Sequence, residues 1–213
     1  MSSFQIWGAL LLSYLILFLL RFFYLLYVVF TSKCELSRTK PLRTIFVIGS
    51  GGHTTELLRF VKNINMKKYT PRLYILADND VGSPAKIHET EKENTDYSLM
   101  RIPRCRNVRQ SPFSAIISTI FASWNSYPII CDFNPDVIFC NGPGTCIPVC
   151  LVAFTMRCFF QLDCRTVFIE SVCRVRTLSL SGKILQFFAD IMVIQWPQLR
   201  ENCFRARYFG RLT

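Results

Sequence analysis

A glycine-rich segment with one histidine is the part of this sequence best suited to chemistry. Residues 49–56 are Gly-Ser-Gly-Gly-His-Thr-Thr-Glu, and they follow directly on the apolar run 44–48. The pattern predicts a buried strand, a tight turn and a helix start, where free N–H groups and the helix dipole favour an anion. His53 adds a side chain that titrates near neutral pH. We therefore expect the turn to bind a phosphorylated ligand.

The elements that position this turn alternate along the chain. Strands that alternate with helices predict an α/β domain with a parallel sheet covered on both faces, as in Rossmann-like folds. In such sheets ligands bind beyond the carboxyl ends of the strands. We expect strands at 44–48, 72–77, 97–102, 137–140, 166–169 and 191–194, and helices at 54–64, 84–93, 113–127, 147–160 and 182–189.

Other polar segments follow the predicted strands and are expected at the same edge of the sheet. Each also has a plainer interpretation, because Asn, Asp, Gly and Pro are ordinary turn formers and arginines commonly form a solvated face. A lone histidine is also more often structural than catalytic. The segments are 78–80 (Asp-Asn-Asp), the basic stretch with Arg101, Arg104, Arg106 and Arg109, 141–145 (Asn-Gly-Pro-Gly-Thr), and Glu170-Ser171 with Arg174 and Arg176 behind it.

Two nucleotide-binding classes fit the turn poorly. It has Thr54 where the third Rossmann glycine belongs, although Asp78 follows the second strand at about the distance that a ribose contact needs. The turn also lacks the lysine of a Walker motif, which disfavours an NTPase. An anchored oxidoreductase therefore remains only a weak alternative.

The first thirty residues predict a membrane anchor. Residues 4–30 are almost wholly apolar and contain one charge, Arg21, and about 20 such residues suffice to cross a bilayer. No basic residue precedes the run and no small-residue cleavage site follows it, which disfavours a cleaved signal peptide. Arg21 is expected to snorkel toward the domain side, so that the embedded part ends near Leu20. The sequence leaves open a full span or a partly interfacial helix.

The charged residues after the apolar run predict the orientation of the anchor in the membrane and the boundary of the domain. Lys33, Arg38, Lys40 and Arg43 follow the apolar run, so the positive-inside rule places the domain in the cytosol. We expect an anchor at 1–31, a basic linker at 32–42 and one Rossmann-like domain at 43–213. The net charge of +11 suits an acidic membrane surface, and we expect no nucleic-acid partner.

The ten cysteines are scattered without CxxC pairs. In a cytosolic domain they would stay reduced, so we expect neither a disulfide framework nor a metal site.

Several motifs occur in order over nearly the whole chain. Together they resemble the membrane-anchoring subunit of the eukaryotic UDP-N-acetylglucosamine transferase of asparagine-linked glycosylation, the asparagine-linked glycosylation protein fourteen family. The glycine turn by itself also resembles the first glycine loop of the bacterial glycosyltransferase that adds N-acetylglucosamine to a lipid diphosphate-linked muramyl peptide. The motifs are 49–56, 141–145, Glu170-Ser171, 178–183 (Leu-Ser-Leu-Ser-Gly-Lys), Ala189-Asp190, 195–197 (Gln-Trp-Pro) and 208–212.

The resemblance implies half of an enzyme. The anchored subunit is similar to the N-terminal, acceptor-side domain of a GT-B glycosyltransferase, and a separate soluble subunit supplies the donor-binding domain. The pair would transfer N-acetylglucosamine from UDP-N-acetylglucosamine to dolichyl-diphosphate-N-acetylglucosamine on the cytosolic face of the endoplasmic reticulum. This chain would bind no cofactor and would be inactive alone, and the metal requirement stays open. About 170 residues follow the anchor, enough for one such domain.

The resemblance also implies site roles. His53 or Glu170 would take the proton from the attacking hydroxyl, with His53 favoured, while burial could raise the pKa of Glu170 toward neutrality. A non-catalytic membrane scaffold is the main alternative. The acceptor diphosphate would bind at Gly49, Ser50, Gly51, Gly52, Thr54, Asn141, Gly142, Gly144 and Thr145.

Two further surfaces are expected outside the catalytic centre. Arg104, Arg106, Arg109 and Trp124 would face the membrane. The helix at 113–127 has an apolar face that packs either against the sheet or into lipid. In the tail, Tyr208, Phe209 and Arg211 would contact the soluble subunit, unless the tail folds back on its own domain. The apolar face consists of Ile116, Ile117, Ile120, Phe121 and Trp124.

Overall fold

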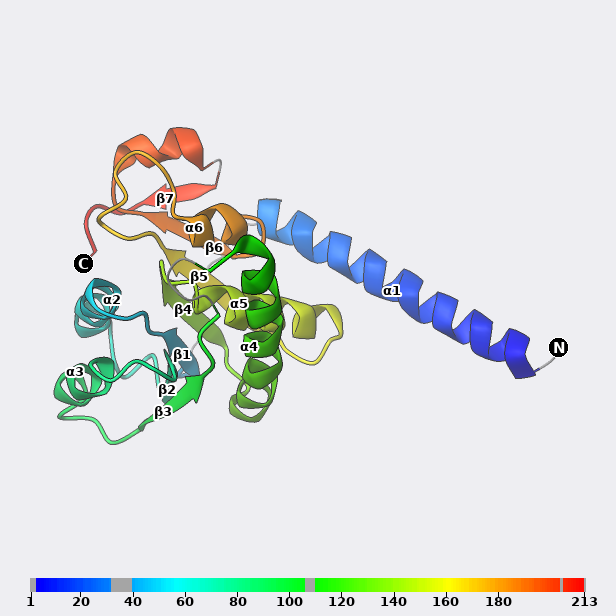
Figure 1. The fold of residues 1–213 in the computed structure, drawn as a ribbon, viewed down its shortest axis with the longest axis horizontal. Coiled ribbons are helices and arrows are strands. Elements are labelled where there is room, and N and C mark those ends of the chain that lie inside the picture. The colour runs from blue at the N-terminus through cyan, green and yellow to red at the C-terminus, as the bar shows by residue number, and fades with distance from the viewer. Residues whose placement is uncertain (1–2, 32–39, 106–109, 204, 213) are drawn as a thin grey trace.

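A long helix projects from an α/β domain (Figure 1). The structure is a computed structural model that describes residues 3–31, 40–105, 110–203 and 205–212. The elements are α1 (Ser3–Thr31), β1 (Thr44–Val47), α2 (Gly52–Asn63), β2 (Arg72–Ala77), α3 (Ser83–Thr90), β3 (Tyr97–Ile102), α4 (Pro112–Phe133), β4 (Val137–Asn141), α5 (Cys146–Cys158), β5 (Arg165–Ile169), α6 (Leu180–Leu185), β6 (Ile191–Ile194), a 3-10 helix (Pro197–Asn202) and β7 (Ala206–Tyr208).

All described strands form one parallel sheet in the order β3-β2-β1-β4-β5-β6-β7. The predicted Rossmann-like fold is therefore confirmed. The seventh strand, β7, pairs with β6, so the tail folds back on its own domain, which was the alternative left open by the sequence. The strand order reverses between β1 and β4, and ligands of doubly wound sheets bind at such a switch point.

Two apolar layers explain why β1 is a continuous apolar run. Ile45 and Val47 face the core under α4, α5 and α6, whereas Phe46 and Ile48 face the core under α2 and α3. Successive side chains of a strand point to opposite faces, so a strand covered on both faces needs apolar residues throughout.

α1 packs on the domain through its C-terminal half. Leu25 and Val29 are buried against α5, and Phe18 stacks on Phe159 with ring centroids 4.9 Å apart. The Arg21 guanidinium lies 4.4 Å from the Phe160 ring centroid, so this charge lies at the domain end of the helix. Among the described residues, α1 is the one helix long and apolar enough to cross a membrane, and an 18-residue window within Gln5–Thr31 has a mean hydropathy of 2.3.

α4 is longer than the helix predicted at 113–127. It continues through Pro128, which removes one helical hydrogen bond, to Phe133 and closes at Asn134 in a left-handed conformation. Its buried positions are Ala122, Ser126 and Ile130, which lie on one face at a spacing of four. Packing along this face holds the last turns together despite the proline.

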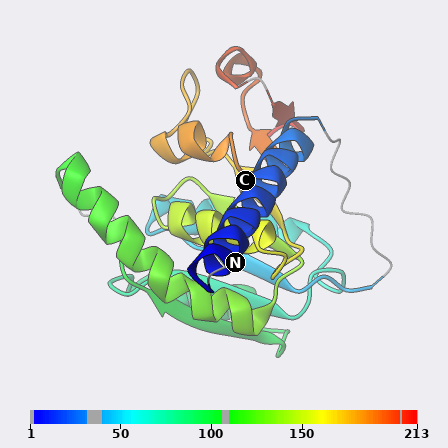
Figure 2. The same cartoon turned by 90° about the vertical axis from the view of Figure 1, so that its right-hand side faces the viewer.

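The expected apolar face of α4 does not contact the sheet. Ile116, Ile117, Ile120, Phe121 and Trp124 are between 58% and 80% exposed. The interpretation that they pack on the sheet is therefore wrong, and contact with lipid stays a prediction. In Figure 2 the first half of α4 extends beyond the rest of the domain.

A buried ion pair ties α5 to the sheet. Arg157 donates from Nη1 and Nη2 to Asp190 at 2.8 and 3.1 Å, and both side chains are almost fully buried. Asp190 also accepts from the backbone N–H of Thr166 in β5. This pair fixes α5 relative to β5 and β6.

Candidate functional site

Strands β1, β4 and β5 end at one edge of the sheet, and the segments that follow them meet there. After β1, Gly51 has φ +67° and ψ −119°, a conformation that favours glycine. No side chain caps the start of α2, and the N–H groups of its first turn have no acceptor within the helix. A Cβ added at Gly51 or Gly52 would meet no described atom within 4 Å. The helix start therefore faces open space, as an anion site requires.

Two other glycines serve packing. A Cβ at Gly49 would lie 2.7 Å from Pro143 Cγ, so Gly49 lets the β1–α2 and β4–α5 segments touch. A Cβ at Gly142 would lie 2.7 Å from His53 Cε1, and Gly142 also has φ +63°. The His53 ring is thus held against the Gly142 backbone. These contacts by themselves account for glycine at 49 and 142, and the predicted contacts of both residues with a diphosphate stay a prediction.

A chain of hydrogen bonds positions the histidine. His53 Nδ1 lies 2.9 Å from Asn141 Oδ1. Asn141 Nδ2 donates to Glu56 Oε2 at 3.1 Å, and Ser171 Oγ donates to Glu56 Oε1 at 2.8 Å. Asn141 and Glu56 are buried, while the His53 side chain is 37% exposed. The four residues come from α2, β4 and the segment after β5, so the fold assembles the chain of bonds.

This arrangement fixes which nitrogen of neutral His53 carries the proton. The Asn141 amide nitrogen donates to Glu56, so its oxygen accepts and Nδ1–H of His53 is the donor. Nε2 then carries the lone pair that a base needs. The Glu56 carboxylate lies 3.9 Å from Nδ1, where it faces the charge that the ring gains on accepting a proton.

Sequence analysis gave no role to Glu56. The sequence does indicate that Glu56 and His53 lie close together, because side chains three residues apart share one face of a helix. Its partners Asn141 and Ser171 lie 85 and 115 residues further along the chain, so only the fold reveals the contact.

Glu170 has a structural environment. It is fully buried, and its oxygens accept from the backbone N–H of Ser171 and from the N–H and hydroxyl of Ser179 at 2.9 to 3.0 Å. Burial raises the pKa of Glu170, as expected. A Cβ at Gly182 would lie 2.4 Å from Oε2, which closes the remaining side. The geometry therefore gives no support to Glu170 as the base and leaves His53.

Several other predicted contacts turn out to hold loops. The buried Thr54 hydroxyl bonds to the Gly49 carbonyl and to Ser83 Oγ, so it is engaged within the fold. Thr145 is also buried, whereas Ser50 is exposed at the turn. Asp80 accepts from the N–H and hydroxyl of Ser83 at the start of α3. The 78–80 segment is thus accounted for as a turn and helix cap.

The basic stretch begins beside the second glycine segment. A Cβ at Gly144 would lie 3.0 Å from Cys105 Sγ, and Arg104 is the residue before this cysteine. Arg106 and Arg109 lie outside the described residues. Arg101 donates to the carbonyls of Asp78 and Asp80, so it supports the turn after β2.

Among the described residues, no group of three or more His, Cys, Asp or Glu side chains could hold a metal ion. Cys140 and Cys150 have Sγ atoms 3.3 Å apart without a disulfide, and a hydrogen bond with a neighbouring thiol, together with burial, raises the pKa values of both thiols.

A family model described as "Oligosaccharide biosynthesis protein Alg14 like" matches residues 44–212, which is the whole α/β domain. The chain belongs to the Alg14 family. It is 42% identical over 184 residues to the UDP-N-acetylglucosamine transferase subunit ALG14 of Mus musculus, covering 82% of this chain and 84% of that protein. It is 39% identical over 188 residues to the Homo sapiens protein of the same name, covering 84% and 87%.

Solved structures show the fold that this Alg14 family member shares. MurG of Acinetobacter baumannii matches with a TM-score of 0.54 at 12% identity, over 73% of this chain and 42% of that one. CalG4, the calicheamicin glycosyltransferase, matches with a TM-score of 0.51 at 10% identity, over 81% and 53%. The chain thus corresponds in fold to about half of each of these two chains.

The C-terminal tail of this Alg14 family member folds back on its own domain. Arg211 lies with its guanidinium 4.3 Å from the Trp196 ring centroid, and the Leu212 N–H donates to Gln195 Oε1 at 3.1 Å. Tyr208 and Phe209 nevertheless remain 37% and 62% exposed. Their contact with a partner stays a prediction.

Proposed function

We propose that this chain is the membrane-anchored, acceptor-binding subunit of a two-subunit UDP-N-acetylglucosamine transferase. It would add the second N-acetylglucosamine to dolichyl-diphosphate-N-acetylglucosamine at the cytosolic face of the endoplasmic reticulum. Its partner is a soluble subunit that binds the UDP sugar. Family membership, the name of the relatives and the match to about half of two glycosyltransferase chains support this division of labour.

The site suggests how the acceptor is held. Its diphosphate binds at the open start of α2, where the N–H groups after Gly51 face the ligand. The acceptor's sugar hydroxyl then lies toward His53. Arg104 precedes Cys105, whose Sγ lies beside Gly144 of the second glycine segment, and its positive charge would support the diphosphate there.

The chemical step follows from the orientation of the histidine. The acceptor hydroxyl oxygen attacks the anomeric carbon of the donor sugar, and the bond from that carbon to UDP breaks with UDP keeping the electron pair. Nε2 of His53 accepts the hydroxyl proton. Asn141 and Glu56 keep the ring in place and do not touch substrate. The observation that carries this proposal is the hydrogen-bonded chain from Ser171 to His53 beside the open helix start.

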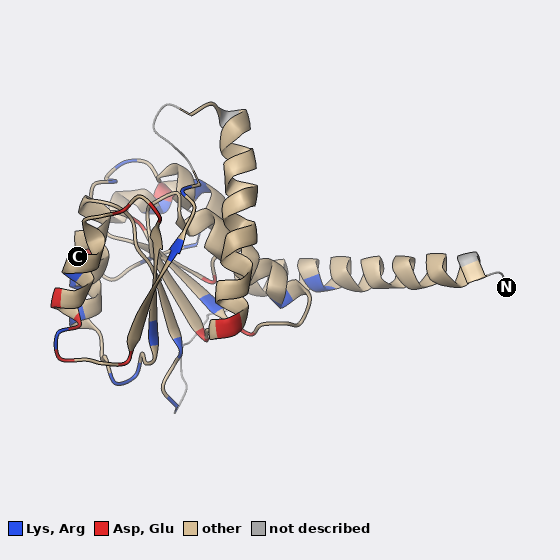
Figure 3. Cartoon of the chain, turned by 60° about the horizontal axis from the view of Figure 1, so that its bottom comes forward, with Lys and Arg blue, Asp and Glu red and all other residues tan. Residues whose placement is uncertain are grey.

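Two helices suggest how the domain meets the bilayer. α1 supplies the anchor, and Figure 3 shows α4 on the side of the domain from which α1 projects, running across its direction. A helix in this position lies along the membrane surface, with its exposed apolar residues, including Trp124, in the interface. The only charged residue of α4 is Asp132, near its end.

The test uses this chain co-expressed with the soluble subunit. We expect His53→Ala to lower sugar transfer to the lipid diphosphate acceptor by about 10²- to 10⁴-fold, because a general base is lost. Copurification of the subunits should not change. His88→Ala is the matched control, since His88 lies on α3 and contacts Tyr97.

A non-catalytic scaffold makes the opposite prediction. If His53→Ala transferred sugar at the wild-type rate, the histidine would not be the base and recruitment alone would explain the subunit. Each subunit assayed alone shows whether the activity belongs to the pair.

A further inference from the structure

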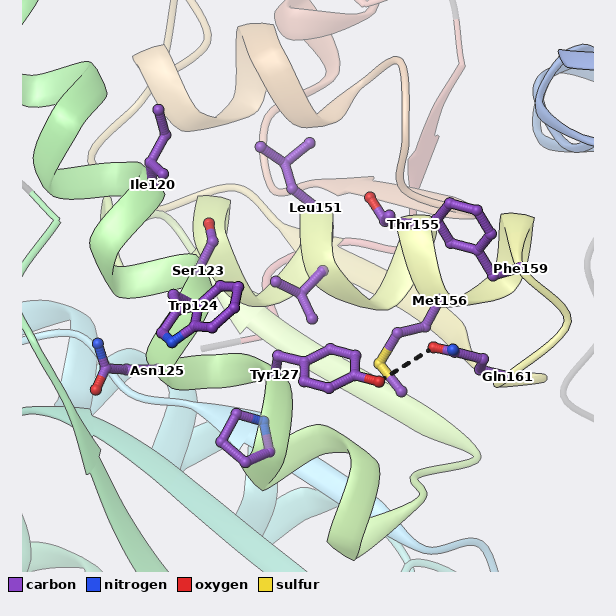
Figure 4. Close-up of a pocket in the computed structure, with 12 residues that line it drawn as sticks. Ile120, Ser123, Trp124, Asn125, Tyr127, Leu151, Thr155, Met156, Phe159 and Gln161 are labelled. Atoms are coloured by element: carbon purple, nitrogen blue, oxygen red, sulfur yellow. Dashed lines mark hydrogen bonds between the residues drawn. The ribbon is translucent and has the colours of Figure 1, made fainter. Parts of the chain in front are cut away.

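A groove separates α4 from α5 on the outer side of the domain (Figure 4). Its volume is about 790 Å³, within the range of pockets that hold small ligands. None of its lining side chains is charged. They are Ile120, Ser123, Trp124, Asn125, Tyr127 and Pro128 from α4, Leu151, Val152, Thr155 and Met156 from α5, and Phe159 and Gln161 just after it.

The groove has defined sides. In Figure 4 Trp124 and Tyr127 extend from α4 toward α5, while Leu151 and Thr155 project from α5. At one end the Tyr127 hydroxyl donates a long hydrogen bond of 3.5 Å to Gln161 Oε1. Ile120 and Trp124 are 64% and 80% exposed, so the groove holds apolar surface that a ligand could remove from water.

α5 connects the groove to both the anion site and the membrane helix. Its first residue, Cys146, follows the 142–145 segment that holds His53, and its last turn is buried against α1. Thirteen residues give α5 a length of roughly 20 Å. Phe159 lines the groove and also stacks on Tyr14 and Phe18 of α1, with ring centroids 6.0 and 4.9 Å apart. The groove is therefore continuous with the surface of α1.

We propose that this groove binds the isoprenoid chain of the acceptor, in the stretch next to its diphosphate. The inference rests on the proposed function, because it takes the diphosphate to lie at the start of α2. A chain that leaves this diphosphate along α5 passes Leu151, Thr155 and Phe159 before it reaches α1 and the bilayer.

Features of the groove favour a hydrocarbon over a protein partner. A protein interface commonly has a polar rim with charged residues, whereas the described lining has no charged side chain. The groove also joins the candidate membrane span directly through Phe159. A lipid chain that enters from the bilayer would remain in apolar contact along the way.

The test fills the groove without entering the core. Thr155 is exposed on α5, so Thr155→Trp places a bulky side chain inside the groove. Leu151→Asn makes the same surface polar. The matched control is Thr95→Trp, because Thr95 is exposed in the segment before β3 and is not part of the groove. Each variant is purified with the soluble subunit and reconstituted in nanodiscs.

The assay compares two acceptors, a dolichyl and a methyl diphosphate-N-acetylglucosamine, of which the second has no isoprenoid chain. For both groove variants we expect KM for the dolichyl acceptor to rise by about tenfold or more, with kcat and KM for the methyl acceptor changed by about twofold at most. Thr95→Trp should leave every value at the wild-type level. This pattern would support a chain-binding groove.

Other patterns overturn the proposal. Equal KM values for wild type and Thr155→Trp with the dolichyl acceptor would show that the chain lies elsewhere. Loss of the soluble subunit on purification of Thr155→Trp would assign the groove to the partner, and loss of nanodisc binding would assign it to bulk lipid. If the wild-type pair transferred sugar to neither acceptor, the proposed function itself would fail. This result is distinct from a failure of the groove proposal alone, in which the wild-type pair stays active.

Discussion

Gly142→Ala tests whether the position of the His53 ring matters for transfer. The new Cβ would lie 2.7 Å from His53 Cε1 and 3.0 Å from Nδ1, so the ring must move away. Because Nδ1 is 2.9 Å from Asn141 Oδ1, that movement breaks or lengthens the bond that orients the ring. Misplacing a reacting group by about 1 Å can cost roughly 10²-fold in rate, and we expect a fall in kcat of that order.

The same substitution also strains the backbone, and this strain must be separated from the displacement of the His53 ring. Residue 142 has φ +63°, where an alanine costs about 1–2 kcal/mol. For a chain of this size that corresponds to a fall in Tm of roughly 2–8 °C. Gly210→Ala is the matched control, because Gly210 has φ +84° and a Cβ there meets no described atom within 4 Å. It carries the same kind of strain without the contact to His53.

The assay measures kcat and KM for sugar transfer by the copurified pair, together with the Tm of each variant. Gly142→Ala should lose both stability and kcat, whereas Gly210→Ala should lose stability alone. The reasoning is refuted if Gly142→Ala turns over at the wild-type rate, or if both variants lose the same kcat.

Two further predictions concern stability. Asp190→Ala leaves the Arg157 guanidinium buried without its carboxylate partner, so it should lower the free energy of unfolding by about 3–5 kcal/mol. The control is Asp163→Ala, which removes an exposed ion pair with Arg165 and should lower it by about 1 kcal/mol at most. Equal denaturation midpoints for the two variants would contradict this prediction. Burial raises the pKa of Glu170 in the folded chain above its ordinary value of 4.5. At pH values between 4.5 and the raised pKa, the folded chain keeps a proton that the unfolded chain has released. The free energy of unfolding therefore falls as pH rises through this window. Urea unfolding across this pH window should show this fall in wild type and a smaller fall in Glu170→Gln. Parallel curves of unfolding free energy against pH for the two proteins would disprove the prediction.

The sequence predicted the sheet well because its strands are buried on both faces. Runs such as 45–48 and 137–140 are apolar throughout, and glycine-bearing segments follow them at one edge. Helix ends were predicted less well, as Pro128 shows. The local pattern at 113–127 does not reveal that Ala122, Ser126 and Ile130 pack well enough to continue α4. A tail that folds back on its own domain was one of two open interpretations, and the three residues of β7 are too few for their pattern to decide between them.

The site was predicted only in its local parts. The glycine turn and His53 stand together in the sequence, and their spacing was sufficient to find them. Glycines that border open space, Gly51 and Gly52, look the same in the sequence as Gly49 and Gly142, which make room for neighbours. Glu170 was a candidate base by its position after a strand, but the contacts with Ser171 and Ser179 that occupy this carboxylate depend on how the chain turns after β5.

The packing of α1 on α5 has a consequence for kinetics. Because α5 extends from the candidate anion site to α1, the candidate membrane span, the height of that site above a bilayer crossed by α1 would be set by the folded core and not by the length of the chain between α1 and β1. In the proposed reaction, enzyme and acceptor would then diffuse in the same plane. The encounter rate would follow the mole fraction of acceptor among the lipids, and diluting the vesicles in water at constant composition would leave it unchanged.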